Sequence, residues 1–103
     1  MVKVNRIDNQ FIVSFFNTKR FNSLIAYQVK PKISALISSP NSEVIFNFNG
    51  INFIDTVGFS ILMELNEEAN SQGSILSISN INEDVRELIS LMKLEQTLKV
   101  LDQ

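Results

Sequence analysis

The spacing of apolar residues changes along this chain between a strand-like period of two and a helix-like period of three to four. Residues 2–7 (VKVNRI) alternate apolar and polar side chains, which predicts a half-buried strand. Residues 11–16 (FIVSFF) are rich in β-branched and aromatic side chains, which predicts the returning strand. Asp8 and Asn9 between them tolerate the positive φ of a tight turn. We therefore expect the chain to open with a β-hairpin.

Helix-like and strand-like stretches then alternate to the end of the chain. The expected strands are residues 43–49, 74–79 and 96–101, and the continuous apolar character of 43–49 predicts a central strand. The expected helices begin near Asn22, at residue 57 and near Asn82. In the first helix we expect a disturbed turn near Pro31, because proline has no backbone N–H and clashes with the preceding turn. The third helix carries an apolar stripe at Val85, Leu88, Ile89 and Met92.

This order of elements predicts an α/β fold. Strands that alternate with helices pair in parallel through right-handed crossovers. We expect an N-terminal β-hairpin followed by alternating helices and strands, which form a mixed, largely parallel sheet of four to five strands with helices packed on it. Residues 1–103 are expected to form a single domain.

The composition excludes several kinds of chemistry. The chain has no Cys and no His, so a Ser-His-Asp triad, a Cys–His pair and an ordinary zinc site are impossible. Glu64, Glu67 and Glu68 share a predicted helix, where a solvated face is favoured over a metal site. We expect no enzymatic activity, no cofactor and no metal.

Charge and hydropathy limit the expected cellular location and the classes of binding partner. A net charge of -2 without a basic stripe argues against nucleic acid as a partner. Apolar runs fall short of the roughly 18 to 20 residues that span a bilayer, and residues 1–10 lack the apolar core of a signal peptide. We expect a cytoplasmic protein without direct membrane insertion.

An acid, a hydroxyl and a glycine follow one another in residues 53–59 (FIDTVGF), between a strand and a helix. Asp55 is expected to cap the helix by accepting hydrogen bonds from its first N–H groups, with Thr56 in the first turn. Gly58 either leaves the backbone open to a partner or avoids a clash inside the fold. Phe59 and Met63 belong either to the core or to an exposed anchor for a partner.

The stretch VIFNFNGINFIDTVGFSILMELNEEA, residues 44–69, resembles the STAS domain family, which includes the anti-sigma factor antagonists. FNSLIAYQVKPKI resembles the segment that enters the family's first helix, and NEDVRELISLMKL resembles its third helix. The resemblance implies a STAS-like fold and a non-catalytic regulatory module. Such a module binds a kinase-type anti-sigma factor, which is a serine/threonine protein kinase, and thereby frees a sigma factor.

The resemblance also implies a site. Its partner-binding residues would be Asp55, Thr56, Val57, Gly58, Phe59, Ser60 and Met63. Val57 occupies the position that the family's kinase phosphorylates, and valine has no hydroxyl; Thr56 and Ser60 are the candidate phosphorylation sites that remain. Asn47 and Asn22 stand where the family often has Asp.

Two other roles stay open for a STAS domain without the phosphorylated residue. One is a subunit that stabilises the cytoplasmic ATPase of a lipid ABC transporter. The other is a scaffold component in stress signalling. The sequence predicts no oligomeric state.

Overall fold

The predicted hairpin is present in the computed structural model, which describes residues 1–101. Strand β1 (Val2–Ile7) pairs antiparallel with β2 (Gln10–Phe15). The turn between them places Asp8 at φ 56°, in the left-handed region that Asp tolerates. The local turn chemistry therefore directs the chain back along its first strand, as predicted.

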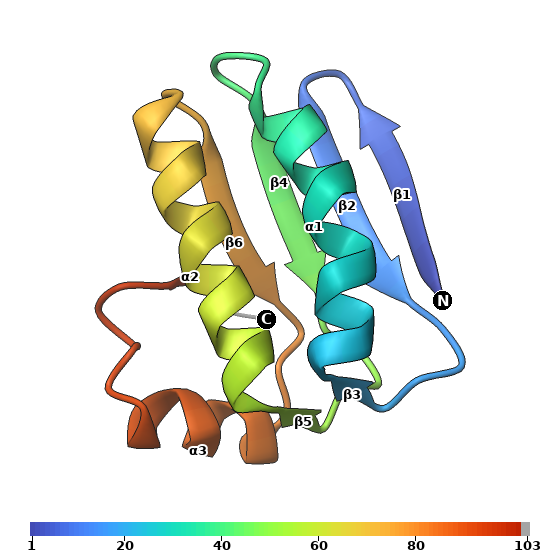
Figure 1. The fold of residues 1–103 in the computed structure, drawn as a ribbon, viewed down its shortest axis with the longest axis vertical. Coiled ribbons are helices and arrows are strands. Elements are labelled where there is room, and N and C mark those ends of the chain that lie inside the picture. Colours follow the sequence, from blue (N-terminus) through green and yellow to red (C-terminus); the bar gives the residue numbers. More distant parts are fainter. Residues whose placement is uncertain (102–103) are drawn as a thin grey trace.

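The main sheet has five strands in the order β1-β2-β4-β6-β7. Strands β4 (Glu43–Asn47), β6 (Ile75–Ser79) and β7 (Lys99–Val100) join the hairpin through parallel pairs, so the sheet is mixed and largely parallel (Figure 1). β4 occupies the centre, as expected, but ends at Asn47. The predicted fold class is confirmed.

The last strand is much shorter than the predicted 96–101. The backbone N–H groups of Thr97 and Leu98 both donate to the Leu94 carbonyl oxygen, at 3.1 and 2.9 Å. Residues 94–98 therefore form a turn rather than a strand, and Leu98 is buried there. β7 begins only after this turn, at Lys99.

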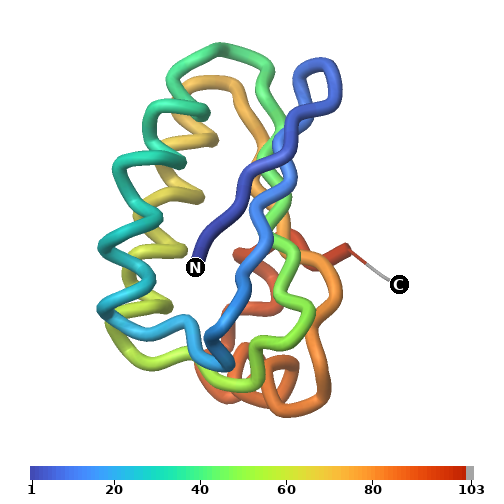
Figure 2. Tube along the Cα trace, turned by 90° about the vertical axis from the view of Figure 1, so that its right-hand side faces the viewer, coloured from blue at the N-terminus to red at the C-terminus, as the bar shows by residue number. Residues whose placement is uncertain are grey.

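Two long helices cover one face of the main sheet, as Figure 2 shows. They are α1 (Ser23–Ile37) and α2 (Thr56–Ser71); the shorter α3 (Glu83–Leu91) lies beyond the lower end of α2 in Figure 1. We expected a disturbed turn near Pro31, but α1 is continuous through it. Pro31 is exposed, while Val29 and Ile33 on either side are fully buried and hold both halves of the helix against the sheet.

A second, two-stranded sheet was not predicted. β3 (Arg20–Phe21) pairs in parallel with β5 (Phe53–Ile54), and each strand leads directly into a helix, β3 into α1 and β5 into α2. Figure 1 shows this small sheet at the lower edge of the molecule, where α1 and α2 both begin. The pairing brings two helix starts together that are far apart in the sequence.

Four phenylalanines form an aromatic cluster in the core. They are Phe15, Phe21, Phe46 and Phe48, with ring centroids 5.4 to 6.2 Å apart. These separations lie within the range in which aromatic rings attract one another. The cluster joins β2, β3 and β4, so it fixes the small sheet against the main one.

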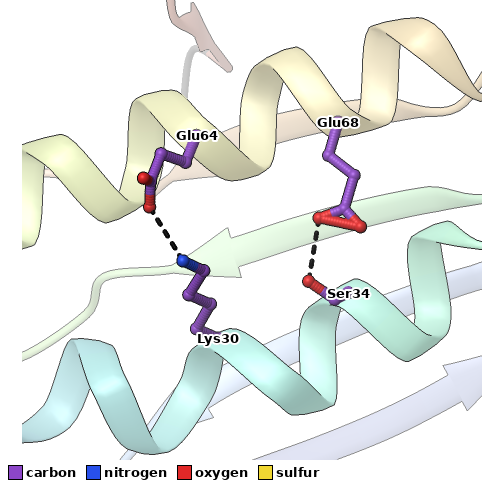
Figure 3. A network of polar contacts seen from close by, with 4 residues as sticks. All are labelled: Lys30, Ser34, Glu64 and Glu68. Atoms are coloured by element: carbon purple, nitrogen blue, oxygen red, sulfur yellow. Dashed lines mark hydrogen bonds and ion pairs between the residues drawn. The ribbon is translucent and has the colours of Figure 1, made fainter.

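Polar contacts join α1 to α2. Lys30 Nζ lies 3.0 Å from Glu64 Oε2, and the Ser34 hydroxyl donates to Glu68 Oε1 at 2.8 Å (Figure 3). Glu67 is exposed. The predicted solvated face is therefore correct for Glu64 and Glu67, although Glu64 also pairs with Lys30, whereas the half-buried Glu68 serves the contact between the helices.

Candidate functional site

The Asp55 carboxylate binds the starts of two helices. Its Oδ1 accepts a hydrogen bond of 2.7 Å from the Gly58 N–H, which confirms the predicted cap of α2. Its Oδ2 accepts a second bond of 3.2 Å from the Ser23 N–H, at the first residue of α1. Both oxygens thus satisfy backbone donors that a helix cannot pair internally. The α2 start is held in place by this carboxylate.

Gly58 serves packing within the fold. A Cβ atom at this position would overlap the Phe21 carbonyl oxygen and lie 3.1 Å from Ile54 Cγ2. Gly58 is buried, so its backbone is covered by β3 rather than open to a partner. Of the two alternatives drawn from the sequence, avoidance of a clash is the correct one.

The side chains of the first two turns of α2 divide between core and surface. Phe59 is 4% exposed and belongs to the core, and Val57 is half-buried and packs against it. Thr56 and Ser60 are exposed, and Met63 is half-buried at the edge of a surface hollow of about 380 Å³ that both hydroxyl residues also line. The surface that faces solvent here therefore consists of Thr56, Ser60 and Met63, which we call the α2-start face.

The two asparagines that replace acids of the family pattern have partners of their own. Asn22 caps α1, with Oδ1 accepting from the Ile25 N–H at 3.2 Å. Asn47 Oδ1 accepts from the Asn49 N–H at 3.0 Å and from Asn80 Nδ2 at 2.9 Å. Asn22 thus holds the start of α1, Asn47 joins the residues that follow β4 and β6, and neither side chain adds negative charge.

Three large apolar side chains beside this face were not predicted to be exposed. Phe53, Leu91 and Met92 expose 40%, 70% and 47% of their surface. Of the predicted apolar stripe Val85, Leu88, Ile89 and Met92, two side chains, Val85 and Ile89, are buried in α3, Leu88 is half-buried, and Met92 is exposed at the C-cap. The signal was present in the sequence: residues 85–94 hold more large apolar side chains than one short helix can bury on a single face.

Residues 1–101 contain no group of three or more His, Cys, Asp or Glu side chains placed to hold a metal ion. None of the helices in this part of the chain has the length and apolar character needed to cross a membrane. What the site offers chemically is a rigid helix start with hydroxyl and apolar side chains on its surface.

Comparison with known proteins places this arrangement in a family. The model of the STAS domain matches residues 3–102. A search of the curated proteins found no match. Three similar solved structures come from different bacteria. An anti-sigma-factor antagonist (STAS) domain protein from Planctomyces limnophilus has a TM-score of 0.86 and 10% identity, covering 99% of this chain and 90% of that chain.

An anti-sigma factor antagonist from Mycobacterium paratuberculosis has a TM-score of 0.80 and 19% identity, and the match covers 100% of this chain and 86% of that one. A sulfate transporter family protein from Wolinella succinogenes has a TM-score of 0.80 and 19% identity, covering 94% and 80% respectively. At these identities the likeness to solved structures shows the shared fold. Since the family model spans nearly the whole sequence, the chain belongs to the STAS domain family.

Proposed function

We propose that this STAS domain is a non-catalytic module that binds a kinase-type anti-sigma factor through the α2-start face. The observation that supports the proposal is that some residues at the start of α2 hold the turn in place while others face solvent. Asp55 holds the turn through hydrogen bonds and Gly58 holds it through close packing, while Thr56 and Ser60 are exposed and Met63 is half-buried beside them. A rigid surface loses little conformational freedom on binding, which favours affinity.

Regulation of this binding would differ from the family's usual switch. Val57 has no hydroxyl and packs against the core, so a phosphate cannot be attached there. The exposed hydroxyl of Thr56 is the alternative acceptor, with Ser60 one turn further along. A phosphate at Thr56 would add about -1.5 to -2 charges to the docking face and would oppose an apolar contact there.

The test is co-purification of the tagged chain with proteins of its native cells, compared with Thr56→Arg and Ser60→Arg. Both positions are exposed, so the substitutions leave the fold intact while blocking the face. Asn70→Arg, exposed near the other end of α2, is the matched control. We expect a kinase-type anti-sigma factor with the wild type and with Asn70→Arg, and its loss with the other two variants. Mass spectrometry of the same samples would detect phosphate on Thr56 or Ser60.

Substitution of Asp55 is unsuitable for this purpose. Its carboxylate holds the starts of α1 and α2, so a loss of binding would not separate contact from local unfolding. Recovery of an ABC transporter ATPase in place of a kinase-type protein would overturn the proposal in favour of a structural subunit. Recovery of neither would overturn it as well.

A further inference from the structure

A trough of apolar side chains runs beside the α2-start face. Three surface hollows, of about 290, 310 and 380 Å³, lie in a row and share lining residues. The middle hollow shares Leu91 with one neighbour and Met92 with the other. The apolar lining of the row includes Phe53, Phe59, Met63, Leu88, Leu91 and Met92. We call this row of hollows the α3 trough.

The charges along the α3 trough have one sign. Asp84 and Glu87 line one end, and Glu64 lines the other. Among residues 1–101, neither Lys nor Arg lines any of the three hollows. Two cations contact lining residues at the edge of the trough: the Arg20 guanidinium lies 5.6 Å from the centroid of the Phe53 ring, and Lys30 pairs with Glu64.

The charges and the apolar surface of the α3 trough indicate what kind of ligand it would bind. Asp84 and Glu87 make no ion pair within residues 1–101, so this end of the trough repels phosphate-bearing ligands and anionic lipid surfaces and attracts cations, whereas Glu64 at the other end is already paired with Lys30. The exposed Leu91 and Met92 between the two ends offer apolar surface that water solvates poorly. We infer that the α3 trough binds a segment of a partner protein that carries large apolar anchors with Lys or Arg beside them, facing Asp84 and Glu87. The inference rests on the proposed function, since Thr56, Ser60 and Met63 of the α2-start face line one of the three hollows, and it names the part of the partner that docks.

Peptide selection tests the inference without knowledge of the partner. A displayed library of random peptides is selected on the immobilised full chain, with depletion on Leu91→Ser. Leu91 is 70% exposed, so its substitution leaves the fold intact. Leu24→Ser is the matched control, because Leu24 is 60% exposed on α1, outside the α3 trough.

The expected peptides carry apolar anchors flanked by Lys or Arg. They should bind Leu91→Ser at least about tenfold more weakly than the wild type, while Leu24→Ser binds them unchanged. Glu87→Lys should also weaken them, and added salt should reduce the difference between Glu87→Lys and the wild type. Peptides with acidic flanks, or a selection that fails to distinguish Leu91→Ser from the wild type, would overturn the inference.

Two further outcomes separate this inference from other readings. Sedimentation of the chain alone should show a species whose mass does not change with concentration. If the chain instead self-associates and Leu91→Ser abolishes this, the occupant is a second copy and the inference is wrong. If a kinase-type partner is lost with Ser60→Arg but binds Leu91→Ser and Glu87→Lys normally, the proposed function stands and the inference is wrong, because the part of the trough lined by Leu91 and Glu87 then takes no part in binding.

Discussion

At the scale of single residues, Asp55 and Gly58 shape the site in different ways. Asp55 supplies acceptors for backbone N–H groups of two helices, at Gly58 and Ser23. Gly58 has no side chain, which leaves room for the Phe21 carbonyl oxygen. The cap was predictable because its partner lies three residues away. The contacts with Phe21 and Ser23 were not, because they connect distant segments.

Substitutions of Asp55 measure what its two hydrogen bonds contribute to the free energy of unfolding. We expect Asp55→Ala to lower the free energy of unfolding by about 1 to 2 kcal/mol, because two helix-start N–H groups lose their acceptor. Asp55→Asn should cost less, because its amide oxygen can still accept from the Gly58 N–H. Urea denaturation followed by circular dichroism measures both values. An alanine variant as stable as the wild type would show that neither bond contributes.

Gly58→Ala tests the close approach of α2 to β3. Helix propensity alone would favour alanine over glycine by about 1 kcal/mol. We nevertheless expect a net loss of about 1 to 3 kcal/mol in the free energy of unfolding, because the new Cβ meets backbone that must shift. Ser60→Ala in the same helix is the control and should change stability by less than about 0.5 kcal/mol. Stabilisation by Gly58→Ala, measured in the same denaturation series, would contradict the packing assigned here.

At the scale of elements, α1 shows how tertiary packing overrides a local signal. Pro31 lies inside this helix, although proline there removes a hydrogen bond to the Tyr27 carbonyl. Ile25, Val29 and Ile33 are buried at 1% exposure or less and hold the helix on the sheet. Most helical stability in proteins comes from such an apolar face rather than from propensity. The sequence therefore showed that Pro31 disfavours a helix, but not that buried contacts keep α1 continuous through it.

Pro31→Ala should stabilise the protein. Alanine restores the N–H and removes the clash, which together are worth roughly up to 3 kcal/mol in a helix interior. The unfolded chain gains freedom when proline is removed, which offsets about 0.4 to 1 kcal/mol. We therefore expect a net rise of about 1 to 2 kcal/mol in the free energy of unfolding. Thermal unfolding would measure it beside Lys32→Ala, an exposed neighbour that should change little. A less stable Pro31→Ala protein would show that the proline does not strain α1.

At the scale of the whole molecule, the aromatic cluster joins the two sheets and so supports the site. The ring of Phe21, at the end of β3, packs against Phe46 and Phe48 at centroid distances of 6.0 and 5.4 Å. Because Phe21 also provides the carbonyl oxygen beside Gly58, the cluster sets where α2 begins. Loss of packing in this cluster would reach the α2-start face through the small sheet.

Two phenylalanines that are close in sequence should respond very differently to truncation. Phe48 is fully buried, and Phe48→Ala should lower the free energy of unfolding by about 3 to 5 kcal/mol. Phe53 is 40% exposed beneath the Arg20 guanidinium, and Phe53→Ala should cost no more than about 1 kcal/mol. Urea denaturation of both variants gives the comparison. Equal losses would contradict the exposure assigned to Phe53.

The sequence by itself determined the order of the main-sheet strands and the three helices, the N-terminal hairpin, the helix caps at Asn22, Asp55 and Asn82, and the central place of β4. These features depend on periodicity and capping, which act between residues a few positions apart. The resemblance to the STAS domain family rested on the same local patterns.

Only the tertiary structure decided the pairing of β3 with β5, the reason for Gly58, and the exposure of Leu91 and Met92 beside the α2-start face. Each depends on contacts between distant segments; Asp55 and Ser23, for example, are 32 positions apart. An apolar side chain on a helix indicates that some surface should be buried, but neighbouring elements decide whether anything in the chain covers it. For Leu91 and Met92 no element of the described chain does so fully, and that exposed surface forms the α3 trough.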